Sequence, residues 1–142
     1  MKPTGPQGDV KKAFAAVPGA PRQRLLQMRT LIFDAAAATE TEPLTETLKW
    51  GQPAYLPARR HGTTIRLGWA PSDPENCKLF VHCQTDLIGR YRQFFPDEFR
   101  YDANRAVLVP ATGSFAEPAL QQIAAMALTY HRDKRSRSSE IA

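Results

Sequence analysis

Residues 63–84 read TTIRLGWAPSDPENCKLFVHCQ, two segments of alternating apolar and polar residues around a turn-forming cluster. Every second residue from 65 to 69 is apolar, and residues 77–84 alternate in the same way. A period of two predicts β-strands that turn one face to a core. Residues 71–76 contain two prolines, a serine, an aspartate and an asparagine, which favour a turn. The short link between the strands favours antiparallel pairing.

Helical and further strand patterns surround this pair. The elements expected in chain order are helices over residues 9–17 and 21–38, a strand over 48–55, strands over 63–69 and 77–84, a helix over 86–95, a hairpin over 99–109 and a helix over 114–131. Pro53 cannot donate to a ladder, so the strand over 48–55 is expected at an edge or with a bulge. Ser114 with Glu117 three residues later matches a capping box. The sequence thus predicts an α+β fold, a mostly antiparallel sheet flanked by N-terminal and C-terminal helices.

The chain length and the charge distribution predict one domain with two basic ends. The 142 residues suffice for a single core. We expect the domain over residues 10–132, a flexible N-terminus over 1–9 and a basic, flexible tail over 133–142. Of the net charge of +5, residues 1–12 and 131–142 carry +2 each. Short basic ends are usually solvated, so nucleic-acid binding by these ends is not expected.

Targeting signals and catalytic motifs are lacking in the sequence. No apolar run reaches the roughly 18 residues of a membrane span, and Met1 to Asp9 is too polar for a secretory signal. We therefore expect a cytoplasmic protein with no membrane partner. The three histidines lack metalloprotease spacing, and no phosphate-binding loop, dinucleotide fingerprint or serine-hydrolase motif occurs. The sequence predicts that the protein is not an enzyme of these kinds.

The two cysteines are expected to be structural. Cys77 and Cys83 are six residues apart, which is about 20 Å along a continuous strand. That separation excludes a disulfide and a shared zinc ion. We predict two buried, reduced thiols that act as small apolar groups.

The segment over residues 46–55 reads ETLKWGQPAY and carries a family resemblance. An acidic or threonine-rich link followed by an aromatic-Gly-x-Pro-x-aromatic strand resembles the YdhG-like group of bacterial domains of unknown function. Residues 64–69, 79–84, 104–106 and 128–131 also resemble that group, and the likeness covers about residues 10–132. The resemblance implies a compact sheet with flanking helices, similar to frataxin. Because some relatives are regarded as intracellular iron chaperones, it also implies iron binding.

An iron site needs hard oxygen ligands, usually carboxylates. Glu42 and Glu46 are four residues apart and would face the same way on a helical turn, so they are the candidate iron ligands. The alternative is a solvated polar link. The helix over residues 21–38 carries three arginines against one aspartate, and such a face would repel a cation.

A second candidate function uses the sheet face opposite the apolar strand positions. Lys49, Arg66, Lys78 and His82 are expected there with Phe80, a surface that suits an anion, a small molecule or an acidic protein partner. The alternative is an ordinary half-exposed sheet face. The predicted ligand-binding residues are Lys49, Trp50, Tyr55, Arg66, Phe80 and His82.

Overall fold

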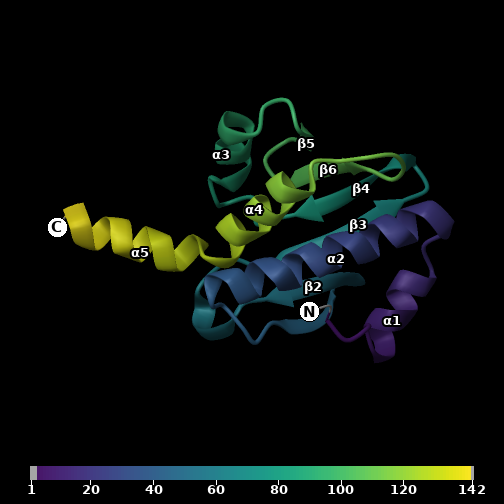
Figure 1. Cartoon of the computed structure of the whole chain (residues 1–142), viewed down its shortest axis with the longest axis horizontal. Helices are drawn as coiled ribbons and strands as arrows, with labels where there is room; N and C mark the ends of the chain where they lie inside the picture. The colour runs from purple at the N-terminus through teal and green to yellow at the C-terminus, as the bar shows by residue number, and fades with distance from the viewer. Residues whose placement is uncertain (1–2, 142) are drawn as a thin grey trace.

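The computed structural model describes residues 3–141 and confirms the α+β fold, with five α-helices and a six-stranded antiparallel sheet in that range (Figure 1). The helices are α1 (Gly8–Ala15), α2 (Gly19–Thr39), α3 (Leu87–Phe94), α4 (Glu117–Leu128) and α5 (Tyr130–Ile141). The strands are β1 (Thr45–Lys49), β2 (Gln52–Leu56), β3 (Ile65–Ala70), β4 (Asp73–Phe80), β5 (Arg100–Asp102) and β6 (Ala106–Pro110), and a 3₁₀ turn covers Ala58–Arg60. The expected helices at the two ends of the chain are therefore present.

The sheet has the strand order β1-β2-β3-β4-β6-β5, and α2 and α4 cross the same face of it (Figure 1). Leu67, Leu79 and Val107 pair across β3, β4 and β6, and all three are fully buried. They belong to one apolar cluster with Met28 and Ile32 of α2. Burial of about 25 cal/mol per Å² of apolar surface makes this layer the main source of stability.

The strand expected over residues 48–55 is a hairpin instead. Trp50 and Gly51 have φ angles of 55° and 75°, and the pair Lys49 and Gln52 closes the two strands around them. Two consecutive residues with positive φ match the hairpin turn whose twist fits antiparallel strands. Pro53 lies outside the short β2–β3 ladder, which pairs residues 54 and 55 of β2, so its missing N–H costs no bond there.

The strand expected over residues 77–84 is displaced toward the N-terminus. β4 begins at Asp73, within the predicted turn cluster, and ends at Phe80, which pairs with both Arg66 and Ala106. Beyond Phe80 the chain turns away, since Thr85 donates its backbone N–H to the carbonyl of His82 at 3.0 Å. The prediction that Cys83 is buried is therefore wrong, because the ladder ends before it.

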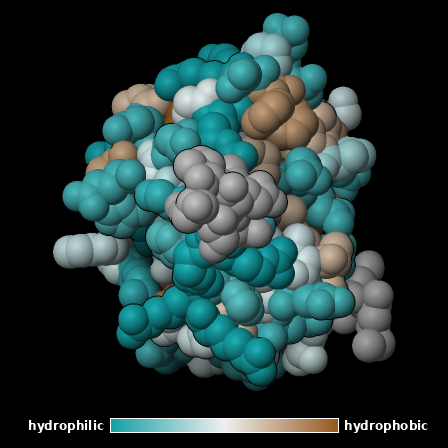
Figure 2. Space-filling view, turned by 90° about the vertical axis from the view of Figure 1, so that its left-hand side faces the viewer, coloured by the Kyte–Doolittle hydropathy of each residue, from teal (hydrophilic) through white to brown (hydrophobic). Residues whose placement is uncertain are grey.

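The final helical region also differs from the expected single helix over residues 114–131. α4 begins at Glu117 without a side-chain cap, so the predicted capping box at Ser114 does not form. Thr129 separates α4 from α5, with its hydroxyl donating to the carbonyl of Ala125 at 2.8 Å. The segment expected as a tail is helical to Ile141 and projects from the body (Figure 1), at an end whose surface is mainly hydrophilic (Figure 2).

A close backbone approach joins the β2–β3 connection to the end of α4. A Cβ atom on Gly62 would lie 2.2 Å from the carbonyl oxygen of Ala127 and 2.3 Å from the carbonyl carbon of Leu128. The backbone N–H of Thr63 donates to the same Ala127 carbonyl at 2.9 Å. This connection therefore requires glycine at position 62.

We predict that Gly62→Ala destabilises the fold by about 2–4 kcal/mol, because backbone atoms on both sides must move apart. Thermal unfolding should show a loss of about 8 °C or more. Gly89→Ala in α3 is the matched control, since a Cβ there meets nothing within 4 Å. Equal melting temperatures of the Gly62→Ala and Gly89→Ala proteins would contradict this account of the connection.

Candidate functional site

The face of the sheet turned away from the helices, which we call the open face, is formed by alternate strand residues. One row runs across it through the paired residues Thr47, Ala54, Arg66, Phe80, Ala106 and Asp102. A second row contains Gly68, Lys78, Leu108 and Arg100. Because side chains alternate along a strand, Lys49 and Gln52 share this face with Thr47 and Ala54.

Arg66 lies at the centre of the open face in a fixed position. Its guanidinium carbon is 5.2 Å from the centroid of the Phe80 ring, and its Nη1 donates to Oε1 of Gln52 at 2.7 Å. Gln52 is the one acceptor among the described residues that this guanidinium reaches. The arginine is therefore oriented by an aromatic ring and one hydrogen bond. Its other N–H groups have no acceptor in the part of the chain that the structure describes.

Gly68 creates the space that this arrangement needs. A Cβ at position 68 would lie 2.5 Å from Nε2 of Gln52 and 3.1 Å from the ring of Phe80. With glycine there, the Gln52 side chain lies against Gly68 and accepts the hydrogen bond from Arg66. Glycine within a strand often marks such a close approach.

The open face carries more positive than negative charge. Lys78 is 3.5 Å from the Asp102 carboxylate, the one acidic side chain in the two rows, while Lys49 and Arg100 are exposed. Partial burial lowers the pKa of Arg66, and the nearby charge of Arg105 lowers it further. Arginine still remains charged at neutral pH, so two like charges lie close together without a described counter-ion between them.

The structure brings together three of the six predicted ligand-binding residues. Lys49, Arg66 and Phe80 share the open face, and Trp50 lies at the β1–β2 turn and is 90% exposed. The face also contains four residues that the sequence did not predict for it: Gln52, Leu108, Arg100 and Asp102. Gly68 within the alternating strand is the one sequence signal that could have indicated the close approach of the Gln52 side chain.

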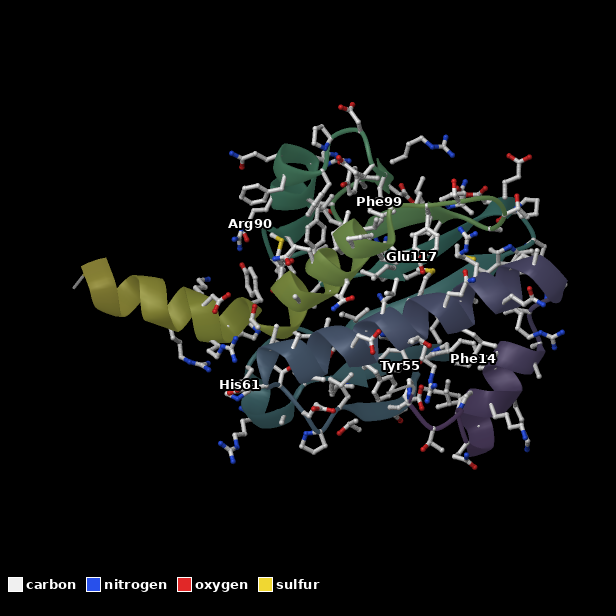
Figure 3. The ribbon with its side chains drawn as sticks, viewed as in Figure 1. Phe14, Tyr55, His61, Arg90, Phe99 and Glu117 are labelled. Carbon is white, nitrogen blue, oxygen red and sulfur yellow. The ribbon has the colours of Figure 1, made fainter. Side chains whose placement is uncertain are left out.

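Tyr55 and His82 lie elsewhere. Tyr55 is buried on the helix side of the sheet beneath α2, where its ring packs edge-on to Phe33 at 5.9 Å (Figure 3). Burial in that apolar layer raises the pKa of the Tyr55 hydroxyl. His82 follows the end of β4 and is exposed, with its Nδ1 accepting a hydrogen bond from the backbone of Gln84. Placing His82 on the sheet face was therefore wrong.

The candidate iron ligand Glu46 is already paired. Its carboxylate lies 2.5 Å from Nε and 3.0 Å from Nη2 of Arg29, and the two side chains are 15% and 6% exposed. Arg29 also donates to the backbone carbonyl of Thr4 at 2.6 Å. Glu46 is in strand β1, so the helical turn expected to align it with Glu42 does not form. An iron ion at Glu46 would have to displace Arg29.

Glu42 and Glu46 nevertheless line the same cavity of about 730 Å³, together with Asp34. Among the described residues, no three histidine, cysteine or acidic side chains come close enough together to hold a metal ion. Iron binding by these carboxylates remains a prediction.

Two of the three arginines of α2 do not contribute to the cation-repelling surface that the sequence predicted. Arg24 is buried and donates to the backbone carbonyls of Pro110 and Gly113, with Phe115 at 4.4 Å from its guanidinium carbon. Arg29 is buried against Glu46. Both arginines therefore connect α2 to other segments of the chain rather than forming an exposed positive face.

Comparison of the chain with protein families, curated proteins and solved structures finds no match. The resemblance to the YdhG-like group accordingly stays a prediction. Within residues 3–141, none of the helices is both long enough and apolar enough to span a bilayer.

We predict that Glu46→Gln lowers the free energy of unfolding by about 3 kcal/mol, because Arg29 is left buried without its counter-ion. Chemical denaturation at neutral pH measures this change. Glu42→Gln is the matched control, since Glu42 is exposed and lacks a described ion-pair partner. Equal stability of the two variants would show that the Arg29–Glu46 pair does not hold β1 to α2.

The two thiols should differ strongly in reactivity. Burial raises the pKa of the Cys77 thiol to about 11, so it carries almost no thiolate at pH 8, whereas Cys83 is exposed. A disulfide-exchange reagent should label one thiol per chain quickly and the second only on unfolding. Cys83→Ser should abolish the fast reaction, and two fast thiols in the native protein would refute the buried position of Cys77.

Proposed function

We propose that the protein binds anions, and that its open face receives a phosphate or carboxylate group at Arg66. The observation that carries this proposal is the fixed position of Arg66 over Phe80, held by Gln52. The planar guanidinium matches both phosphate and carboxylate in a two-bond geometry that lysine lacks.

Preorganisation supports a binding role for this arginine. Ordering a long side chain on binding costs about 0.5–1.5 kcal/mol, and here that cost has already been met in the free protein. Gly68 serves the same arrangement, because a larger residue would displace the Gln52 side chain. A solvated surface arginine would need neither feature.

The electrostatic environment also favours an anion. Arg66 is half-buried, so charge interactions around it are stronger than in bulk water. The neighbouring charge of Arg105 is repulsive in the free protein. An anion bound between the two side chains would turn this repulsion into two attractions.

We predict that Arg66→Ala weakens binding of tripolyphosphate about tenfold or more, measured by calorimetry at low ionic strength. Arg66→Lys should recover part of the loss, because charge returns without the planar fork. Gly68→Ala should also weaken binding, although no charge changes. Melting temperatures of all variants check that the fold is intact.

Arg92→Ala is the charge-matched control, because Arg92 is exposed on α3, on the helix side of the sheet. It should leave the affinity within about twofold. Equal losses in the Arg66 and Arg92 variants would show a diffuse charge effect, and no binding of tripolyphosphate or citrate by the intact protein would overturn the proposal.

A further inference from the structure

The positive charges of the open face are spread across the whole sheet. Lys49 lies on edge strand β1, Arg66 and Lys78 on the central strands, and Arg100 on the opposite edge strand β5. Neighbouring strands are about 4.8 Å apart, so the five intervals from β1 to β5 span about 24 Å. A compact anion reaches only part of this array, whereas an extended polyanion can contact all of it.

Apolar and aromatic groups lie between these charges. Phe80 and Leu108 are half-buried in the two rows, and Ala54 and Ala106 are small and fully buried, so they add no bulk to the surface. Trp50 adds an exposed indole next to Lys49 at the β1 edge. Planar bases stack on aromatic rings and guanidinium groups, and they do so with little dependence on sequence.

An acidic peptide would satisfy the charges but would not use the planar groups. A rigid duplex would present its phosphates on a cylinder and would leave its bases stacked inside. A flexible single strand offers both phosphates and free base faces, so it matches more of this surface than either.

Resting on the proposed anion site at Arg66, we infer that a single-stranded nucleic acid lies across the open face, from the β1–β2 turn to β5. Its phosphates contact Lys49, Arg66 and Lys78, and a base stacks on Trp50. The width of the face corresponds to at least about four nucleotides. The basic ends of the chain, from which the sequence predicted no such binding, are not needed for this contact.

The test is fluorescence anisotropy with a labelled twelve-nucleotide oligothymidylate and its oligouridylate counterpart, over a series of salt concentrations. Three phosphate contacts predict a slope of about −2 in a plot of log K against log salt. Lys78→Ala should weaken binding and reduce the magnitude of the slope by about 0.7. Lys12→Ala, an exposed lysine on α1, is the matched control and should change neither quantity.

Loss of base stacking should change the affinity without changing its salt dependence, unlike loss of a charge. Trp50→Asn removes the indole and places in the turn a residue that tolerates positive φ. It should weaken binding about fivefold or more and leave the salt slope unchanged. Arg66→Lys, which retains the charge, should weaken binding less than Arg66→Ala does.

Three results would overturn this inference while leaving the anion site in place. The first is Arg66-dependent binding of tripolyphosphate with no binding of the oligonucleotide. The others are tighter binding of polyglutamate than of the oligonucleotide at equal salt, and an affinity for a duplex equal to that for the single strand. Equal effects of the Lys12 and Lys78 variants would place the nucleic acid away from the open face. Failure to bind either the oligonucleotide or tripolyphosphate would overturn both proposals.

Discussion

The pairing of β3 with both β2 and β4 determines the character of the two sheet faces. With Arg66 opposite Phe80, and Leu67 opposite Leu79, each alternate residue is committed to one side. A shift of one residue would put an arginine into the apolar layer and a leucine on the open face. The helices that cover one side, and the charged groups that remain on the other, both depend on this single register.

The polar groups of the two faces differ in how much of their hydrogen-bonding capacity is used. On the helix side, Arg24 and Arg29 are enclosed by carbonyl oxygens, by the carboxylate of Glu46 and by aromatic rings. Such satisfied groups tie segments together and have little capacity left for a ligand. On the open face, Arg66 is oriented but has far fewer described partners. Unused donors on an oriented side chain are what the proposed anion site requires.

Much of the fold could be predicted from local periodicity, and the errors arose where distant segments decide the outcome. Alternation in β3 placed Arg66 on the open face correctly, and Phe80 followed from the same rule in β4. Cys83 was misplaced because alternation continues in the sequence after the neighbouring strands have ended. Nothing in a local pattern indicates where a partner strand stops.

In the candidate site, too, local patterns predict some features, whereas others depend on residues distant in the sequence. Arg29 has the pattern of a solvent-facing helical residue, and only its pairing with Glu46, 17 positions later, shows that it is buried. Alternation puts Gly68 on the same face as Arg66, but the reason for a glycine there is the Gln52 side chain from the adjacent strand. Trp50-Gly51 lacks the asparagine that usually marks a two-residue turn, so the sequence predicts one edge or bulged strand where the structure has a hairpin.

Helix α5 projects from the body of the molecule and offers a site for attaching a label or a support. Its first turn is secured to the body, since Arg132 donates its backbone N–H to His61 at 2.8 Å and its side chain to Thr39 at 2.7 Å. The whole helix has twelve residues and is about 18 Å long, and the turns after this anchored one project outward. A fluorophore, an affinity tag or a surface tether joined to this helix would be carried clear of the sheet, so the protein can be immobilised by that end with its open face left accessible.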